Sequence, residues 1–170
     1  MAAIFILNAS NSLSQTNRTW DIFVSFQGNA TAYDRTVNNN YAGLGLGLQT
    51  IIGKSPKIRA IVEVNGDLFA GTKMLYVTAD EKPIKGKTAV LGFYGGALLQ
   101  VTPYLFVAGA VGTSIYNSRA HLGLRPSIGL FPFGNRKWLI RTSFTNVLQR
   151  DEISNASFGY LSFSVALKLR

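Results

Sequence analysis

Apolar and polar residues alternate along most of the chain with a period of two. The clearest run covers residues 58–69, in which Ile58, Val62 and Leu68 fall on one side. Glu63 and Asp67 belong to the opposite set. Since successive side chains of an extended strand point to opposite faces, this pattern predicts a strand with one apolar and one polar face.

The same pattern recurs eight times, with turn-forming residues between the runs. Each run is long enough to cross a bilayer, which takes about 9–11 residues of a tilted strand. The pattern therefore predicts an all-β fold, an eight-stranded antiparallel up-and-down transmembrane β-barrel. The runs cover residues 19–28, 41–52, 58–69, 87–101, 104–116, 120–131, 137–147 and 160–169.

The lengths of the connections distinguish a membrane barrel from a soluble one. Short turns are predicted at residues 53–56, 102–103 and 132–136, whereas long polar connections occupy residues 29–40, 70–86 and 148–156. The connection around Asn117 departs from this alternation, because it is short as well. Outer-membrane barrels have short periplasmic turns and longer extracellular loops, so both ends of the barrel domain are predicted to lie in the periplasm.

Aromatic residues are predicted to mark the two membrane interfaces. Trp20 and Trp138 begin two strands that run in the same direction, which places both tryptophans at one interface. Phe144 and Phe158 are expected near the other interface. These four residues form the predicted membrane-interface girdle.

Composition supports a membrane environment for the apolar faces. Of the 170 residues, 47% are apolar and 15% are charged, and the mean hydropathy is positive at +0.17. No stretch approaches the about 18 consecutive apolar residues of a membrane-spanning helix. A bilayer covers this much apolar surface if it lies on the outside of strands.

Charge and reactive residues argue against several functions. The 17 basic residues give a net charge of +9, but they are scattered without a basic stripe, so nucleic-acid binding is not expected. The chain has no cysteine, which excludes a disulfide-stapled fold. His121 is the single histidine, so a metal site or a catalytic triad would have to be built around it. We predict no enzyme activity, cofactor or metal.

The first 14 residues differ from the rest of the chain. An apolar run at residues 2–7 is followed by a polar segment rich in Asn and Ser. A small residue, Ser14, precedes Gln15, as at the cleavage site of a secretory signal peptide. We interpret residues 1–14 as a signal-peptide remnant or a disordered N-terminus, and residues 15–170 as a single transmembrane β-barrel domain.

In this architecture, residues 19–170 resemble the small eight-stranded outer-membrane barrels, the class that includes the OmpA transmembrane domain and OmpX. Gln15 directly after Ser-Leu-Ser also resembles the mature start of outer-membrane proteins from Bacteroidota. The chain ends in Arg170, whereas members of the class usually end in an aromatic residue that the assembly machinery recognises. The resemblance implies the outer membrane of a Gram-negative-type bacterium, with membrane lipids and lipopolysaccharide as partners. It leaves open a protein partner, at the extracellular loops or in an outer-membrane complex.

Six charged residues fall on the inner faces of the predicted strands, away from the C-terminus. The interior of an eight-stranded barrel is narrow enough for side chains to fill it, and buried charges must pair. We predict a lumen ion-pair network with Glu63 near its centre, bonded to Arg141, Arg125 or both. The six residues, three acids and three arginines, are Asp21, Arg59, Glu63, Asp67, Arg125 and Arg141.

These features favour a non-enzymatic outer-membrane scaffold with a plugged lumen, in a structural, adhesive or partner-binding role. One alternative is a narrow conduit for small or apolar solutes, as in barrels similar to OmpW. A second is a lipid A-modifying enzyme, although the chain lacks the His-x-Ser-type motif of the deacylases. A third is a soluble lipocalin-like carrier, which the small number of charges in the alternate register disfavours.

Overall fold

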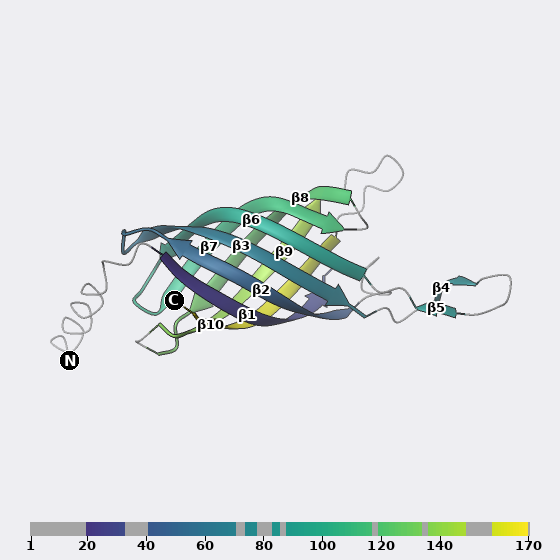
Figure 1. Cartoon of the computed structure of the whole chain (residues 1–170), viewed down its shortest axis with the longest axis horizontal. Helices are drawn as coiled ribbons and strands as arrows, with labels where there is room; N and C mark the ends of the chain where they lie inside the picture. The colour runs from purple at the N-terminus through teal and green to yellow at the C-terminus, as the bar shows by residue number, and fades with distance from the viewer. Residues whose placement is uncertain are drawn as a thin grey trace.

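The protein folds from extended strands whose alternating side chains face either a lumen or the outside. The computed structural model describes residues 20–32, 41–70, 74–77, 83–85, 88–116, 119–133, 136–148 and 158–169. Residues 1–14 lie outside this described part, so their interpretation stays a prediction. Eight strands form the barrel (Figure 1): β1 (Trp20–Thr31), β2 (Ala42–Ile52), β3 (Ile58–Phe69), β6 (Thr88–Gln100), β7 (Leu105–Tyr116), β8 (Arg119–Leu130), β9 (Trp138–Leu148) and β10 (Phe158–Lys168).

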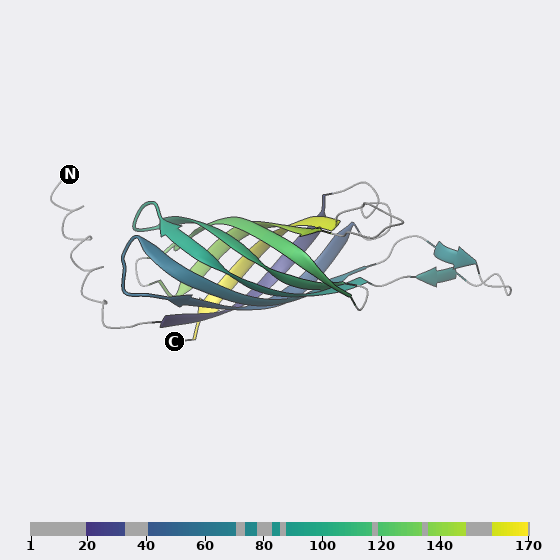
Figure 2. The same ribbon diagram turned by 90° about the horizontal axis from the view of Figure 1, so that it is seen from above.

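The strands close into one antiparallel barrel in the order β1-β10-β9-β8-β7-β6-β3-β2. Figure 2 shows the strands inclined to the long axis of the barrel. The seam between the first and last strands pairs Val24 with Leu167 and Phe26 with Val165. The eight-stranded all-β barrel predicted from the sequence is therefore confirmed.

Two further short strands lie in the connection between β3 and β6, where the sequence pattern predicted a loop. β4 (Met74–Val77) and β5 (Pro83–Lys85) pair antiparallel in a sheet of their own. This small sheet lies beyond the end of the barrel (Figures 1 and 2). Strands of four and three residues contain too few alternations for a period of two to be recognised.

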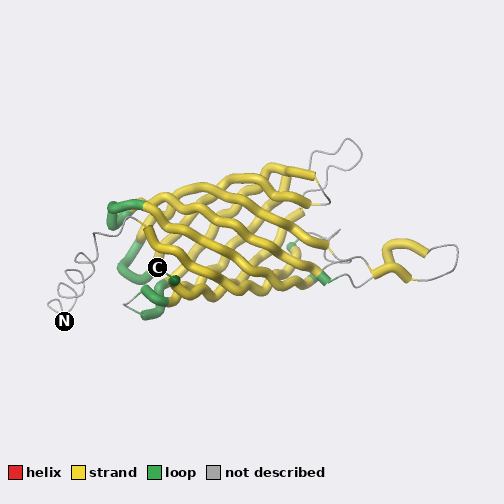
Figure 3. Tube along the Cα trace, in the orientation of Figure 1, coloured by secondary structure: helices red, strands yellow, loops and turns green. Residues whose placement is uncertain are grey.

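Three short connections gather at one end of the barrel, whereas the short connection from β7 to β8 lies at the other end. The three join β2 to β3, β6 to β7 and β8 to β9, and they lie at the end where β10 finishes (Figure 3). This end is named the turn end, and the opposite one the loop end. Trp20 and Trp138 both lie at the turn end, since Trp20 pairs with Ile52 and Trp138 with Leu167.

The outer face of the barrel is apolar along all eight strands. Thirty large apolar side chains of the described residues are exposed, and the outward positions of the barrel strands include no Asp, Glu, Lys or Arg. A soluble monomer rarely exposes an apolar patch of more than a few hundred Å². The arrangement is the reverse of a soluble carrier, whose apolar face would line an internal cavity. The described residues include no helix long and apolar enough to span a membrane.

Two apolar clusters occupy the lumen, one towards each end, with polar residues between them. The alternation pattern did not reveal them, because an inward apolar residue is inconspicuous in a run already rich in apolar residues. The turn-end cluster consists of Phe23, Ile51, Leu98, Phe106, Phe131, Leu139 and Ala166. The loop-end cluster consists of Phe69, Val90, Val147, Phe158 and Tyr160.

Phe158 corrects the predicted girdle. Its side chain is only 2% exposed, and its ring packs 5.4 Å from the ring centroids of both Phe69 and Tyr160. Phe158 lies two residues before the inward-facing Tyr160, so the period of two turns it into the lumen and away from the membrane. Phe144 is half-buried on the outward face, and Trp20 and Trp138 are exposed on it.

Candidate functional site

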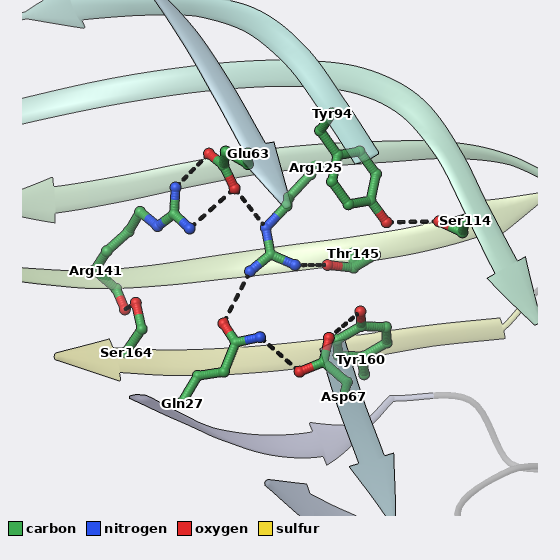
Figure 4. A network of polar contacts seen from close by, with 10 residues as sticks. All are labelled: Gln27, Glu63, Asp67, Tyr94, Ser114, Arg125, Arg141, Thr145, Tyr160 and Ser164. Atoms are coloured by element: carbon green, nitrogen blue, oxygen red, sulfur yellow. Dashed lines mark hydrogen bonds and ion pairs between the residues drawn. The ribbon is translucent and has the colours of Figure 1, made fainter. Parts of the chain in front are cut away.

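Glu63 on β3 lies at the centre of a buried group of charges in the lumen (Figure 4). Arg141 on β9 binds this carboxylate in a bidentate manner: Nη1 contacts Oε1, and Nη2 donates to Oε2 over 3.0 Å. The Nε atom of Arg125 on β8 lies 3.1 Å from the same Oε2. The three side chains are at most 2% exposed. Two cations therefore share one buried carboxylate: Arg141 reaches it from directly across the lumen, since three strands separate β3 from β9 in either direction, and Arg125 reaches it from the neighbouring β8.

Arg125 extends the network towards the loop end with its remaining donors. Its Nη1 donates to Oγ1 of Thr145 over 2.6 Å, and its Nη2 donates to Oε1 of Gln27 over 3.2 Å. The guanidinium also lies 5.7 Å from the ring centroid of Tyr94, an attractive cation–π arrangement. The hydroxyl groups of Tyr94 and Ser114 are hydrogen-bonded over 2.5 Å. Arg125 is thus fixed on several sides.

Asp67 on β3 is held by neutral donors. Oδ1 accepts hydrogen bonds from Nε2 of Gln27 over 2.5 Å and from Nδ2 of Asn29 over 2.7 Å. Oδ2 accepts a hydrogen bond of 2.8 Å from the hydroxyl of Tyr160. Gln27 therefore links Arg125 to Asp67, because its carbonyl oxygen accepts from one and its amide nitrogen donates to the other.

The central network balances its charges. It contains two carboxylates, Glu63 and Asp67, and two guanidinium groups, Arg125 and Arg141. Burying ions is costly unless their geometry and additional hydrogen bonds compensate for the lost hydration. The bidentate pair between Arg141 and Glu63 and the three donors to Asp67 supply such compensation.

The other two predicted residues lie apart from this network, at the turn end. Oδ2 of Asp21 lies 3.5 Å from Nη1 of Arg59, and Oδ1 of Asp21 contacts Nζ of Lys168. Arg59 also donates from Nη2 to Oε1 of Gln100 over 3.1 Å. The structure therefore distributes the six residues over two separate groups.

Inward-facing glycines make room for the network. A Cβ at Gly45 on β2 would lie 1.9 Å from Oδ1 of Asp67 and 2.9 Å from Nε2 of Gln27. A Cβ at Gly123 on β8 would lie 2.5 Å from Oγ of Ser114. These small inner residues thus provide the space that long side chains need in a narrow lumen.

Several members of the network were not among the candidate residues chosen from the sequence. All of them occupy inward-facing positions in the same period-two alternation as the charged residues, and this alternation was the feature of the sequence that could have indicated them. The alternation alone does not say which inward residues meet, because that depends on the stagger between distant strands. These members are Gln27, Asn29, Tyr94, Ser114, Thr145 and Tyr160.

The chemistry of this network suits a structural role. Its members are carboxylates, guanidiniums, amides and hydroxyls that contact one another within the lumen (Figure 4). Within the described ranges, no group of three or more His, Cys, Asp and Glu is placed to hold a metal ion.

Comparison with known proteins relates the chain to others by fold alone. No family model and no curated protein sequence matches it. The crystal structure of Ail, the attachment invasion locus protein of Yersinia pestis, in complex with the heparin analogue sucrose octasulfate aligns with a TM-score of 0.56 at 11% identity, over 88% of this chain and 97% of Ail. The backbone structure of Ail in a phospholipid bilayer nanodisc gives 0.57 at 12%, over 88% and 99%. A de novo designed transmembrane β-barrel gives 0.52 at 9%, over 88% and 95%.

Proposed function

We propose that the protein is an integral outer-membrane β-barrel that acts as a non-enzymatic scaffold with a lumen closed to solutes. The observation that carries this proposal is the packing of the lumen. The Glu63 network, which consists of Glu63, Asp67, Arg125, Arg141 and their hydrogen-bond partners, lies between the turn-end cluster and the loop-end cluster and shares Tyr160 with the latter. Each cluster is formed by buried side chains from several strands. A conduit needs a continuous water-filled path through the lumen. The two apolar clusters and the ion-paired network between them block such a path.

The exterior supports the proposed membrane location. Its apolar surface covers all eight strands, and Trp20 and Trp138 are exposed together at the turn end, where an interface girdle would lie. Phe144 would serve the opposite interface. The similarity in fold to a protein of an outer membrane and to a designed transmembrane barrel agrees with this location. In this arrangement the turn end faces the periplasm.

The loop end is the proposed place for an adhesive or partner-binding role. Function commonly resides in loops that a rigid scaffold positions. The β4–β5 sheet lies beyond this end of the barrel (Figure 2), so a partner would meet it before the barrel wall. Ail, which shares the fold, is an attachment protein by name and has been captured with a heparin analogue. For this chain we propose only that the loop end has an adhesive or partner-binding role and that the barrel contacts lipopolysaccharide and other membrane lipids.

Planar-bilayer recordings test the closed lumen. The wild-type protein is expected to give no large, steady current, because both apolar clusters and the Glu63 network fill the lumen. Glu63→Ala removes the shared carboxylate and is expected to produce flickering openings. Leu44→Ala, which shortens an exposed side chain on the outer face, is the matched control and should behave as the wild type. Insertion is verified separately by protease protection.

A different result would refute the closed-scaffold proposal. A large, steady wild-type conductance that Glu63→Ala leaves unchanged would show that ions bypass the network. The narrow-conduit alternative would then be the better description.

A further inference from the structure

The turn end carries an excess of positive charge. Its described residues contain a single carboxylate, that of Asp21, against six basic side chains. Both oxygens of Asp21 already contact cations, Lys168 and Arg59. The six basic residues come from two of the short connections and from the adjoining strand ends: Lys54, Lys57, Arg59, Arg136, Lys137 and Lys168.

Most of these basic side chains are placed to contact an anion from the surroundings, rather than a carboxylate of the protein itself. Lys54, Lys57 and Lys137 are exposed, and Arg136 is half-buried with its guanidinium 5.4 Å from the ring centroid of Phe131. Six cations against one carboxylate leave an excess of five positive charges among the described residues of this end. A field of one sign attracts counter-charges from the surroundings.

The surroundings of these charges have the character of a membrane interface. Aromatic and apolar side chains are exposed among and beside the basic residues, in the short connections and at the strand ends. Rings exposed at the end of an apolar barrel wall sit at the level of lipid headgroups, where basic side chains attract anionic lipids. The exposed residues are Trp20, Val101, Tyr104, Phe133, Trp138 and Leu169.

The long connections differ in charge from the turn end. In sequence they contain both signs, with the acidic residues Asp34, Asp80, Glu81, Asp151 and Glu152 among their basic ones. A uniform attraction of anions is therefore a property of the turn end.

We propose that the turn end is a binding surface for anionic phospholipids, whose phosphate groups contact Lys54, Lys57 and Arg136. The inference rests on the proposed insertion of the barrel into a membrane. Phospholipid of the leaflet at the turn end would supply the missing negative charge, and Trp20 and Trp138 would hold the barrel at the matching depth.

Lipid retention provides the test. The folded protein is inserted into nanodiscs containing phosphatidylcholine and phosphatidylglycerol in equal amounts, and the lipids retained on release are counted by native mass spectrometry. The wild type is expected to retain phosphatidylglycerol preferentially. Lys54→Gln combined with Lys57→Gln should lower that preference about five-fold for each charge removed at low ionic strength. Arg119→Gln, at the loop end, is the matched control and should leave the preference unchanged.

The outcomes separate this inference from the proposed function. A wild type that inserts into phosphatidylcholine but shows no preference for phosphatidylglycerol would overturn the lipid site while leaving the scaffold intact. Failure to insert at all would overturn both. An equal loss of preference in Arg119→Gln would place the attraction elsewhere and also refute the inference.

A second arm distinguishes lipid from free phosphate. In neutral detergent, phosphatidylglycerol should raise the Tm of the wild type, and inorganic phosphate at the same concentration should not. If both raise it equally, and Lys54→Gln with Lys57→Gln abolishes both effects, the surface binds free anions and the lipid assignment is wrong.

Discussion

Replacing Glu63 with alanine should lower the free energy of unfolding by about 3–5 kcal/mol, because removal of one partner leaves uncompensated buried charge. Arg141 loses its bidentate acceptor and Arg125 its nearest carboxylate, while both guanidiniums stay at most 2% exposed. Urea titration of the protein in lipid vesicles measures the loss. The fluorescence of Trp20 and Trp138, the only two tryptophans, reports the transition.

A double-mutant cycle shows whether the loss comes from the pair. Glu63→Ala, Arg141→Met and the combined variant are compared, and the combined variant should cost less than the sum of the two single changes. Lys57→Gln, which changes an exposed cation directly before β3, serves as the control for a general change of charge, with all variants measured in vesicles of phosphatidylcholine alone. Strictly additive losses, or a Glu63→Ala loss no larger than that of the control, would contradict the central position of Glu63.

Substitution of Gly112 with alanine should prevent the barrel from closing normally. A Cβ at this position on β7 would lie 1.9 Å from the backbone oxygen of Phe93 and 2.7 Å from Cα of Tyr94, both on the adjacent β6. Backbone of a paired strand gives way less easily than the end of a side chain, so we expect a destabilisation at or above the about 1–3 kcal/mol typical of overpacking. The folded fraction is read from the mobility of unheated and heated samples on a gel.

Gly109 on the same strand provides the matched control. It faces outward, and a Cβ there would meet no atom within 4 Å. Gly109→Ala should therefore fold as the wild type does, although it makes the same chemical change three residues away. If both variants fold equally well, the close approach of Gly112 to the backbone of β6 does not limit the stability of the barrel.

The fold and the sidedness of the strands follow from the sequence because they depend on local alternation. A strand such as β3 displays its apolar and polar sets on opposite faces wherever it pairs, so its exposed Val62 and buried Glu63 were predictable from neighbouring residues. The short turns containing Gly53, Pro56 and Pro103 were predictable for a similar reason, since glycine and proline act on the local backbone.

The sequence also predicted that Glu63 would meet Arg141, Arg125 or both, and the structure brings both to its carboxylate. That prediction used only the inward-facing positions of the charged residues and the balance of their signs. It included Asp67 in the network but did not identify the neutral donors Gln27 and Tyr160, because these carry no charge that would have indicated them.

By itself, the sequence determined the approximate positions of the eight barrel strands and which side of each faces out, because a period of two is a local property of extended backbone. The tertiary structure alone decided that Phe158 packs into the loop-end cluster and that Gln27 bridges Arg125 and Asp67. The physical reason is that closure fixes the stagger of every strand against those across the lumen. Only that stagger determines which inward side chains reach the same depth, and so which of them pair.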